Sequence, residues 1–277
     1  MIEFLRALAS QGFLQNAALA GMLAGLGCGV MGSYVVVKRI AFLAGGIAHA
    51  VLGGMGVAYY LGASPMAGAL VAALAAALLI GMVNLRWRQH EDTLISALWS
   101  VGMAVGIVFI SRTPGYNVDL MSYLFGNILM VDRTQLVTMA VLDGCILALV
   151  LLFHRQLLAV AFDEEFARLR GVNVELFTLL LLCMAALTVV LLIQVVGLIL
   201  VIALLTLPAA IAAQYAGSLG RMMVLASILG AVFAVAGLAV SYGPDLPAGA
   251  TIILVAGGAY LLSTFLVAPL TRRRRSS

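Results

Sequence analysis

One histidine of this chain lies inside a long apolar segment, where an ionisable side chain is costly and therefore points to a function. His49 is preceded by Gly45 and Gly46 and followed by Gly53 and Gly54. A neutral imidazole is a natural ligand for a divalent transition metal, and the glycines would leave space beside it for an ion or a neighbouring helix. The alternative interpretation is a histidine that is hydrogen-bonded in a packed interior.

Three aspartates are candidates for attracting a cation. Asp143 lies in a second apolar segment and needs a partner there, which could be His49 or a cation. The alternative is a protonated carboxyl group that donates to a backbone carbonyl. Asp119 and Asp245 fall in predicted external loops, where they would help to attract cations at an entrance or would simply be solvated.

A dense run of charge, residues 162–175, separates two apolar stretches and predicts a short helix. Three of its four acidic residues come first and both of its basic residues follow them, the order that the helix dipole favours. The predicted helix has a capping residue, two acidic residues in its first turn, two basic residues in its last turn and a glycine just past its end: Asp163, Glu164, Glu165, Arg168, Arg170 and Gly171.

Three apolar residues of the same run, Phe162, Phe166 and Leu169, recur at helical spacing. They would form one apolar edge on an otherwise solvated helix, a shape suited to docking in a groove of another protein. An ordinary charged loop between two apolar helices is the alternative.

Composition indicates the class of protein that must position these residues. Of the 277 residues, 64% are hydrophobic and 9% are charged, whereas soluble domains carry about 25% charged residues. The sequence pI of about 9.2 does not indicate nucleic acid, because four of the basic residues form the run Arg272 to Arg275, which flanks a predicted membrane helix. We therefore predict an all-α polytopic membrane protein with a single domain, residues 1–277.

A membrane-spanning helix needs about 20 mostly apolar residues. Windows of this kind fall near residues 14–37, 41–61, 66–86, 93–112, 134–154, 174–194, 196–215, 222–242 and 249–269. They give nine spans, or eight if one is broken, and Pro208 should break or kink the helix that contains it. If the C-terminus is cytoplasmic, every basic residue except Arg6, Arg112 and Arg133 lies inside. The positive-inside bias thus places the C-terminus and the charged run in the cytoplasm and, with nine spans, the N-terminus outside.

Several catalytic patterns are missing from the sequence. Lys38 is the only lysine, and it is not part of a phosphate-binding loop of the form G-x-x-x-x-G-K-[ST]. The sequence also lacks a Gly-x-Ser-x-Gly elbow, an H-E-x-x-H pair and a C-x-x-C pair. If ATP drives this protein, another subunit must hydrolyse it.

Six segments, taken in order, cover nearly the whole chain and carry a family resemblance. They are GGIAHA at 45–50, EDTLI at 91–95, DLMSYLFGNIL at 119–129, FDEEFARLRG at 162–171, QVVGL at 194–198 and PAA at 208–210. In combination they resemble the zinc/manganese/iron permeases of ATP-binding-cassette (ABC) importers.

The resemblance implies a fold similar to that of the vitamin B12 permease, located in the cytoplasmic (inner) membrane of a prokaryote. It implies a homodimer, two ATPase subunits and an extracytoplasmic metal-binding protein that delivers the ion, with membrane lipid around them, no permanently bound cofactor and no nucleic acid. The charged run, at about 162–172, would be the coupling helix that docks in the ATPase. The histidine on the family's translocation path matches His49.

One position departs from the family pattern. Manganese and zinc members usually have an aspartate four residues before that histidine, and this chain has Gly45. The departure removes a hard oxygen ligand and leaves the metal preference open. We hypothesise that Asp143 supplies a replacement carboxylate from a neighbouring helix.

The sequence therefore predicts a permease, not itself an enzyme, that imports Zn, Mn or Fe ions by alternating access. Two alternatives remain open. One is an importer of the same architecture for a metal chelate such as cobalamin or a siderophore, and the other is a self-sufficient secondary carrier or channel. A purely structural scaffold would explain the apolar bulk but neither the charged run nor His49.

Overall fold

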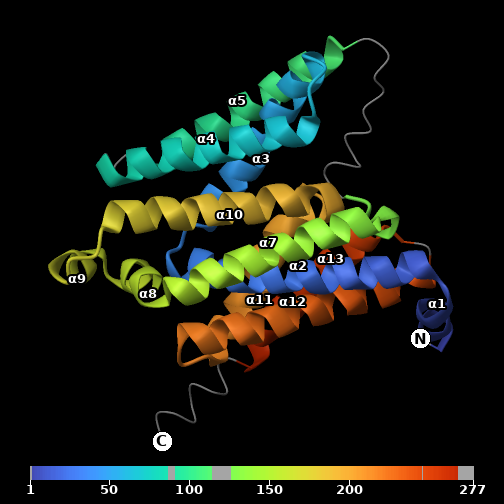
Figure 1. Cartoon of the computed structure of the whole chain (residues 1–277). Coiled ribbons are helices and arrows are strands. Elements are labelled where there is room, and N and C mark those ends of the chain that lie inside the picture. The colour runs from blue at the N-terminus through green and yellow to red at the C-terminus, as the bar shows by residue number, and fades with distance from the viewer. Residues whose placement is uncertain (1, 87–90, 114–125, 245, 268–277) are drawn as a thin grey trace, which may run out of the picture.

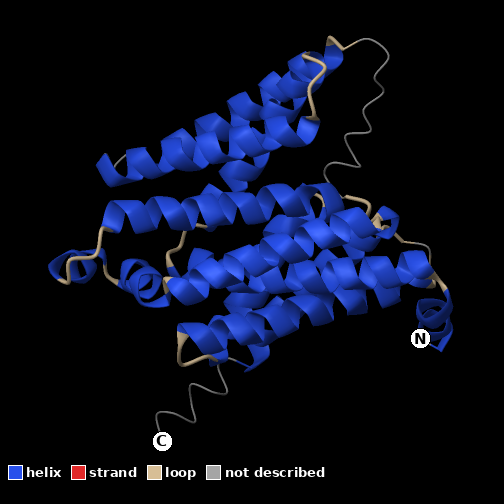
Figure 2. Ribbon diagram, in the orientation of Figure 1, coloured by secondary structure: helices blue, strands red, loops and turns tan. Residues whose placement is uncertain are grey.

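The computed structural model describes residues 2–86, 91–113, 126–244 and 246–267. Over these residues the chain consists of helices joined by short connections, with no strand (Figure 2). The prediction of an all-α protein is therefore confirmed for the part of the chain that the structure describes.

Nine of the described helices are long and apolar enough to cross a membrane. They are α2 (Gly12–Val37), α3 (Ala41–Tyr60), α4 (Pro65–Arg86), α5 (Glu91–Ser111), α7 (Arg133–Leu152), α10 (Val174–Val196), α11 (Leu198–Tyr215), α12 (Leu219–Tyr242) and α13 (Ala248–Leu262). Each begins within three residues of a predicted window, because an apolar run that matches the bilayer thickness is a strong sequence signal.

The spans form two groups. Helices α3, α4 and α5 pack together, and α10 lies between them and the remaining spans, among which α2 is central (Figure 1). Glycine permits the closest approaches in both groups. A Cβ on Gly25 of α2 would collide with the backbone of Ala231 in α12, and a Cβ on Gly53 of α3 would lie 2.8 Å from the carbonyl oxygen of Gly102 in α5. In lipid, such small residues let helix backbones pack closely.

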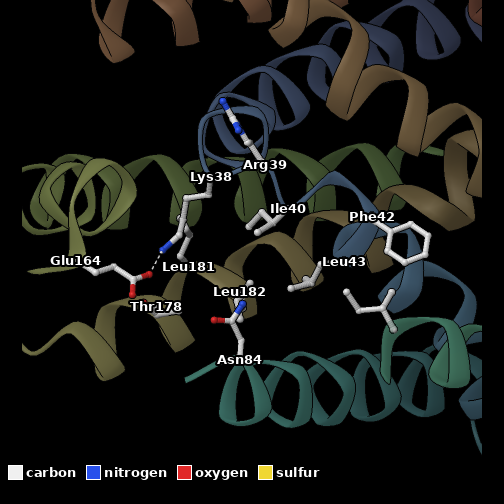
Figure 3. Close-up of a pocket in the computed structure, with 11 residues that line it drawn as sticks. Lys38, Arg39, Ile40, Phe42, Leu43, Asn84, Glu164, Thr178, Leu181 and Leu182 are labelled. Atoms are coloured by element: carbon white, nitrogen blue, oxygen red, sulfur yellow. Dashed lines mark hydrogen bonds and ion pairs between the residues drawn. The ribbon is translucent and has the colours of Figure 1, made fainter. Parts of the chain in front are cut away.

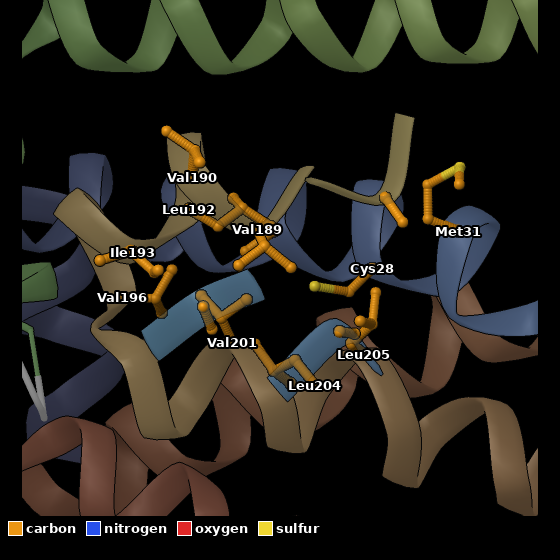
Figure 4. Close-up of a cluster of buried hydrophobic side chains, with 14 of the residues drawn as sticks. Cys28, Met31, Val189, Val190, Leu192, Ile193, Val196, Val201, Leu204 and Leu205 are labelled. Carbon is orange, nitrogen blue, oxygen red and sulfur yellow. The ribbon is translucent and has the colours of Figure 1, made fainter. Parts of the chain in front are cut away.

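Apolar side chains fill the interior between α2, α10 and α11 (Figure 4). The cluster includes Cys28, Met31, Val189, Val190, Leu192, Ile193, Val196, Val201, Leu204 and Leu205, all of them buried. Lipid tails are as apolar as these side chains, so dispersion and close packing hold the helices together rather than expulsion of water. The three helices therefore depend on the fit of this cluster.

Pro208 does not break its helix, since α11 runs without interruption from Leu198 to Tyr215. The chain breaks instead at Gly197, which has a φ of 81° and separates α10 from α11. A proline inside a membrane helix is tolerated where neighbouring groups surround the freed backbone carbonyl, and Pro208 is buried between helices. The prediction that Pro208 breaks its helix is therefore wrong. The alternative, a kink at Pro208, remains a prediction.

The N-terminal helix and the charged run lie at opposite ends of the bundle. A short helix that the sequence patterns did not reveal, α1 (Ile2–Ser10), packs on α12 through the edge-to-face pair of Phe4 and Tyr242. The charged run lies at the opposite end of the bundle, beside the C-terminal end of α2 (Figure 1). The prediction that the N-terminal segment and the charged run lie on opposite sides of the membrane agrees with this arrangement.

Candidate functional site

The intramembrane histidine is buried and stacked. His49 lies on α3 with 8% of its surface exposed, and its ring lies nearly parallel to that of Trp99 on α5, with ring centroids 4.0 Å apart and an interplanar angle of 13°. The Nδ1 atom of His49 has no hydrogen-bond partner among the described residues. Buried polar atoms nearly always have a partner, so this nitrogen is an exception among the described residues.

The glycines around His49 do not all leave space. A Cβ on Gly46 would lie 2.5 Å from Cγ2 of Ile95, and α5 similarly crowds Gly53. Gly45 is different, because a Cβ there would meet only Cζ3 of Trp99, at an ordinary contact distance of 3.8 Å. Room for an added group beside the imidazole is therefore concentrated at Gly45.

Asp143 is buried on α7 and faces α2. Its Oδ1 occupies the place that a side chain at Gly27 would take, and its Oδ2 has no hydrogen-bond partner among the described residues. His49, by contrast, faces α5. No hydrogen bond or ion pair joins Asp143 to His49 in the described part of the chain, and the same part contains no group of three or more His, Cys, Asp or Glu side chains placed to hold a metal ion. The two other aspartates of interest, Asp119 and Asp245, lie outside the described residues.

The charged run forms a short helix, α9 (Glu164–Leu169), with the predicted ends. Asp163 caps it by accepting a hydrogen bond from the backbone nitrogen of Phe166 at 2.9 Å. The acidic residues and Arg168 occupy the turns expected from the sequence, whereas Arg170 lies past the end of the helix and not in its last turn, and the left-handed residue that follows is a glycine. In order they are Glu164 and Glu165 in the first turn, Arg168 in the last, Arg170 one residue past the end, and Gly171 with a φ of 75°.

A second short helix, α8 (His154–Phe162), precedes α9. It buries Leu157, Val160 and Ala161, which recur every three to four residues along one face. This pattern was present in the sequence but runs directly on from the preceding apolar span, so it did not stand out as a separate helix.

The presence of α8 corrects one prediction. Phe162 ends α8, and the extended backbone of Asp163 separates it from α9, so Phe162, Phe166 and Leu169 do not form a single helical edge. All three are nevertheless exposed, at 65%, 49% and 86%. Phe162 and Phe166 line one hollow of about 920 Å³, which is also lined by the N-cap and first two residues of α12, residues 218–220. Arg170 stacks over the ring of Phe166, 5.0 Å from its centroid.

Two contacts attach α9 to the bundle. Ala167 is fully buried against Val160 of α8 and Val174 of α10. On another side of the helix, Glu164 forms an ion pair with Lys38, the residue that follows α2 (Figure 3). In the sequence Lys38 is recognisable only as a positive charge, because its partner lies 126 residues away and gives no local signal.

Comparison with known proteins shows which family this chain resembles. The sequence matches the ABC 3 transport family over residues 10–267. A probable metal transport system membrane protein of Chlamydia pneumoniae is 42% identical over 89% of this chain and 85% of its own length. A manganese transport system membrane protein, MntC, of Halalkalibacterium halodurans is 37% identical over 95% of this chain and 90% of its own length.

Solved structures show the same fold. The chain is similar to PsaBC from Streptococcus pneumoniae, solved in complex with a Fab, with a TM-score of 0.86, 36% identity and coverage of 96% of both chains. It also shares its fold with an inward-facing putative metal-chelate type ABC transporter, with a TM-score of 0.72, 13% identity and coverage of 94% of this chain and 88% of the other. The predicted architecture of an ABC importer permease is therefore confirmed.

Proposed function

The chain belongs to the ABC 3 transport family, and on that premise we propose that it is the permease subunit of an ATP-driven importer of a divalent transition metal ion. The observation that carries this proposal is the buried imidazole of His49, whose Nδ1 has no partner among the described residues. An unpartnered imidazole nitrogen in a membrane span is suited to bind a transition metal. Relatives named as manganese transport proteins favour the same class of cargo.

The ion would be held weakly at His49, as passage requires. Imidazole suits zinc and iron, whereas manganese prefers carboxylate and carbonyl oxygens. Which of the three ions is carried therefore depends on the oxygen ligands that join His49, and Asp143 remains our proposed source of one. The close stack of His49 on Trp99 favours a bare ion over a bulky chelate.

The ATP-hydrolysing partner would dock at α9. The exposed rings of Phe162 and Phe166 and the hollow beside them offer an apolar surface to another protein. Two copies of this chain with two ATPase subunits would form the importer, and an extracytoplasmic metal-binding protein would deliver the ion near Asp119 and Asp245. The positive-inside bias supports a cytoplasmic position for α9.

Transport would proceed by alternating access. The ATPase would engage α9 differently in its two nucleotide states, and this difference in binding free energy would shift the permease between its conformations. The ion bound near His49 would thereby be exposed first to the outside and then to the cytoplasm.

Reconstitution of the chain in lipid vesicles, with and without its ATPase and delivery protein, tests the proposal. We expect uptake of Mn²⁺, Zn²⁺ or Fe²⁺ only when ATP and the ATPase are present. His49→Ala should lower that uptake by roughly 10- to 100-fold, the range over which groups that support a metal site affect it. Metal flux through the chain alone would instead establish a secondary carrier or channel.

Ser33→Ala is a matched control for the loss of a buried polar group in a span. Ser33 is fully buried on α2, and its hydroxyl donates to the carbonyl oxygen of Gly29 within the same helix. We expect normal uptake in this variant. Normal uptake in His49→Ala as well would remove His49 from the path of the ion.

A further inference from the structure

An ion pair between Lys38 and Glu164 connects α9 to the turn between α2 and α3. The ammonium nitrogen of Lys38 lies 3.0 Å from Oε1 of Glu164 (Figure 3). It also donates to the carbonyl oxygen of Val160 at 3.2 Å. The side chains are 12% and 24% exposed, respectively. Lys38 therefore reaches from the end of α2 to both α8 and the first turn of α9.

The turn that carries Lys38 is tight and hydrogen-bonded. Only three residues separate α2 from α3, and the middle one, Arg39, has a left-handed backbone with a φ of 59°. The backbone nitrogen of Ile40 donates to the carbonyl oxygen of Val35 at 2.9 Å, which closes the turn against α2. A displacement at Lys38 therefore reaches the start of α3 without a flexible loop in between.

Helix α3 carries His49 eight residues beyond its first residue, Ala41. At the rise of an α-helix this separation is about 12 Å along the axis. The turn at Lys38 therefore leads directly into the helix that carries the proposed ion ligand, His49.

Two hollows flank the ion pair between α9 and this turn. Lys38 and Glu164 both line an inner cavity of about 220 Å³, together with Asn84 of α4 and Thr178 of α10. They also both line a second, more open hollow of about 600 Å³ on the side of α9. The pair therefore stands between two hollows, and a contact of this kind is lost when either charge is removed.

The attachment of α9 to the rest of the bundle does not depend on Lys38. Ala167 is buried with Val160 and Val174 in an apolar cluster of its own. Because this apolar attachment is separate from the ion pair, removal of the Lys38 charge should leave the docking surface of α9 in place.

We propose that Lys38 is the positioning residue that transmits movement of α9 to α3 through its ion pair with Glu164. This inference rests on the proposed function, in which the ATPase moves α9. Loss of the pair would let the ATPase dock and hydrolyse ATP while α3 and His49 follow its movement less closely.

The test is the number of Mn²⁺ ions taken up per ATP hydrolysed, measured on the complete importer in lipid vesicles. We expect Lys38→Gln to assemble with the ATPase and to hydrolyse ATP, but to lower this ratio by about tenfold, within the range that single residues contribute to coupling between sites. Lys38→Arg, which keeps the pair, should retain most of the ratio. The charge exchange Lys38→Glu with Glu164→Lys should recover part of what Lys38→Glu alone loses.

Arg39→Gln is the matched control, because it removes the neighbouring charge from an exposed side chain without touching Glu164. We expect a normal ratio in this variant. A normal ratio in Lys38→Gln, a loss of the same size in Arg39→Gln, or no recovery in the charge exchange would each overturn the proposal.

Failure of this inference can be told apart from failure of the proposed function. If Lys38→Gln no longer bound the ATPase, Lys38 would belong to the docking surface and the coupling role would be wrong, while the assignment of α9 would stand. If the wild-type chain moved metal without ATP, the proposed function itself would fail.

Discussion

The imidazole of His49 and the indole of Trp99 lie face to face, with ring centroids 4.0 Å apart and an angle of 13° between the rings. This contact joins α3 to α5 at the level of the proposed ion site. An aromatic face that covers the imidazole restricts its rotation and leaves the ring edge, where the nitrogens are, for a ligand. If His49 binds the ion as proposed, Trp99 would act on the ion through the orientation of His49.

Replacing Trp99 should weaken metal uptake without removing a ligand. Aromatic pairs of this kind contribute about 0.5–1.5 kcal/mol beyond the area that they bury, so Trp99→Ala should raise the metal concentration for half-maximal uptake by about 2- to 10-fold. Trp99→Phe keeps an aromatic face and should lie close to wild type. Equal losses in the two variants would mean that the size of the indole matters rather than the stack.

A carboxylate introduced at Gly45 should change the metal preference. A side chain there has room beside Trp99 and lies one helical turn before His49. Because manganese prefers oxygen ligands, Gly45→Asp should raise Mn²⁺ uptake relative to Zn²⁺ uptake in a competition assay. Gly46→Asp is the matched control, and we expect poor folding of that variant because its Cβ would lie 2.5 Å from Ile95. An unchanged preference in a well-folded Gly45→Asp protein would contradict the assignment.

The contact between Asp143 and Gly27 should be intolerant of added volume. A Cβ at Gly27 would overlap the carboxylate, and overpacking of this kind costs about 1–3 kcal/mol. Gly27→Ala should therefore lower the thermal midpoint of the detergent-solubilised protein, and Asp143→Ala in the same chain should recover part of the loss. No recovery in the double variant would show that another neighbour causes the strain.

Asp143→Asn tests the proposed ligand role separately, because it preserves the shape of the side chain and removes only its charge. If Asp143 contributes an oxygen ligand, metal uptake should fall or the preference among Mn²⁺, Zn²⁺ and Fe²⁺ should shift at unchanged protein levels. Uptake and preference identical to wild type would end that hypothesis and leave Asp143 as a packing residue of the interface between α2 and α7.

The sequence predicted features that depend on neighbouring residues. The cap at Asp163 and the left-handed Gly171 follow from the order of residues within one short segment, and the nine spans follow from apolar runs of bilayer length. The burial of His49 followed from its apolar surroundings in the same way.

Contacts between distant segments could not be predicted from neighbouring residues. Trp99 is 50 residues from its partner His49, and Lys38 is 126 residues from Glu164, so neither pair leaves a pattern in a single sequence. The hypothesis that Asp143 accompanies His49 depended on such a contact, and the described structure places the two at different helix interfaces. The sequence therefore did not reveal at which helix interface each of these two ionisable residues lies, and the ligand role of Asp143 stays a proposal.

Phe166 offers the sharpest test of the proposed docking surface. Its ring is half exposed, lines the hollow beside α8 and is covered on one face by Arg170. A buried aromatic anchor in an interface is commonly worth 2 kcal/mol or more, so Phe166→Asp should weaken association with the ATPase by about 30-fold or more. Because the side chain is exposed in this chain, the membrane fold should remain intact, as judged by thermal stability and a single peak in size-exclusion chromatography.

The control variant is Ser10→Asp, at an exposed position at the opposite end of the bundle, and it should bind the ATPase normally. Normal complex formation in Phe166→Asp would refute the docking assignment of α9.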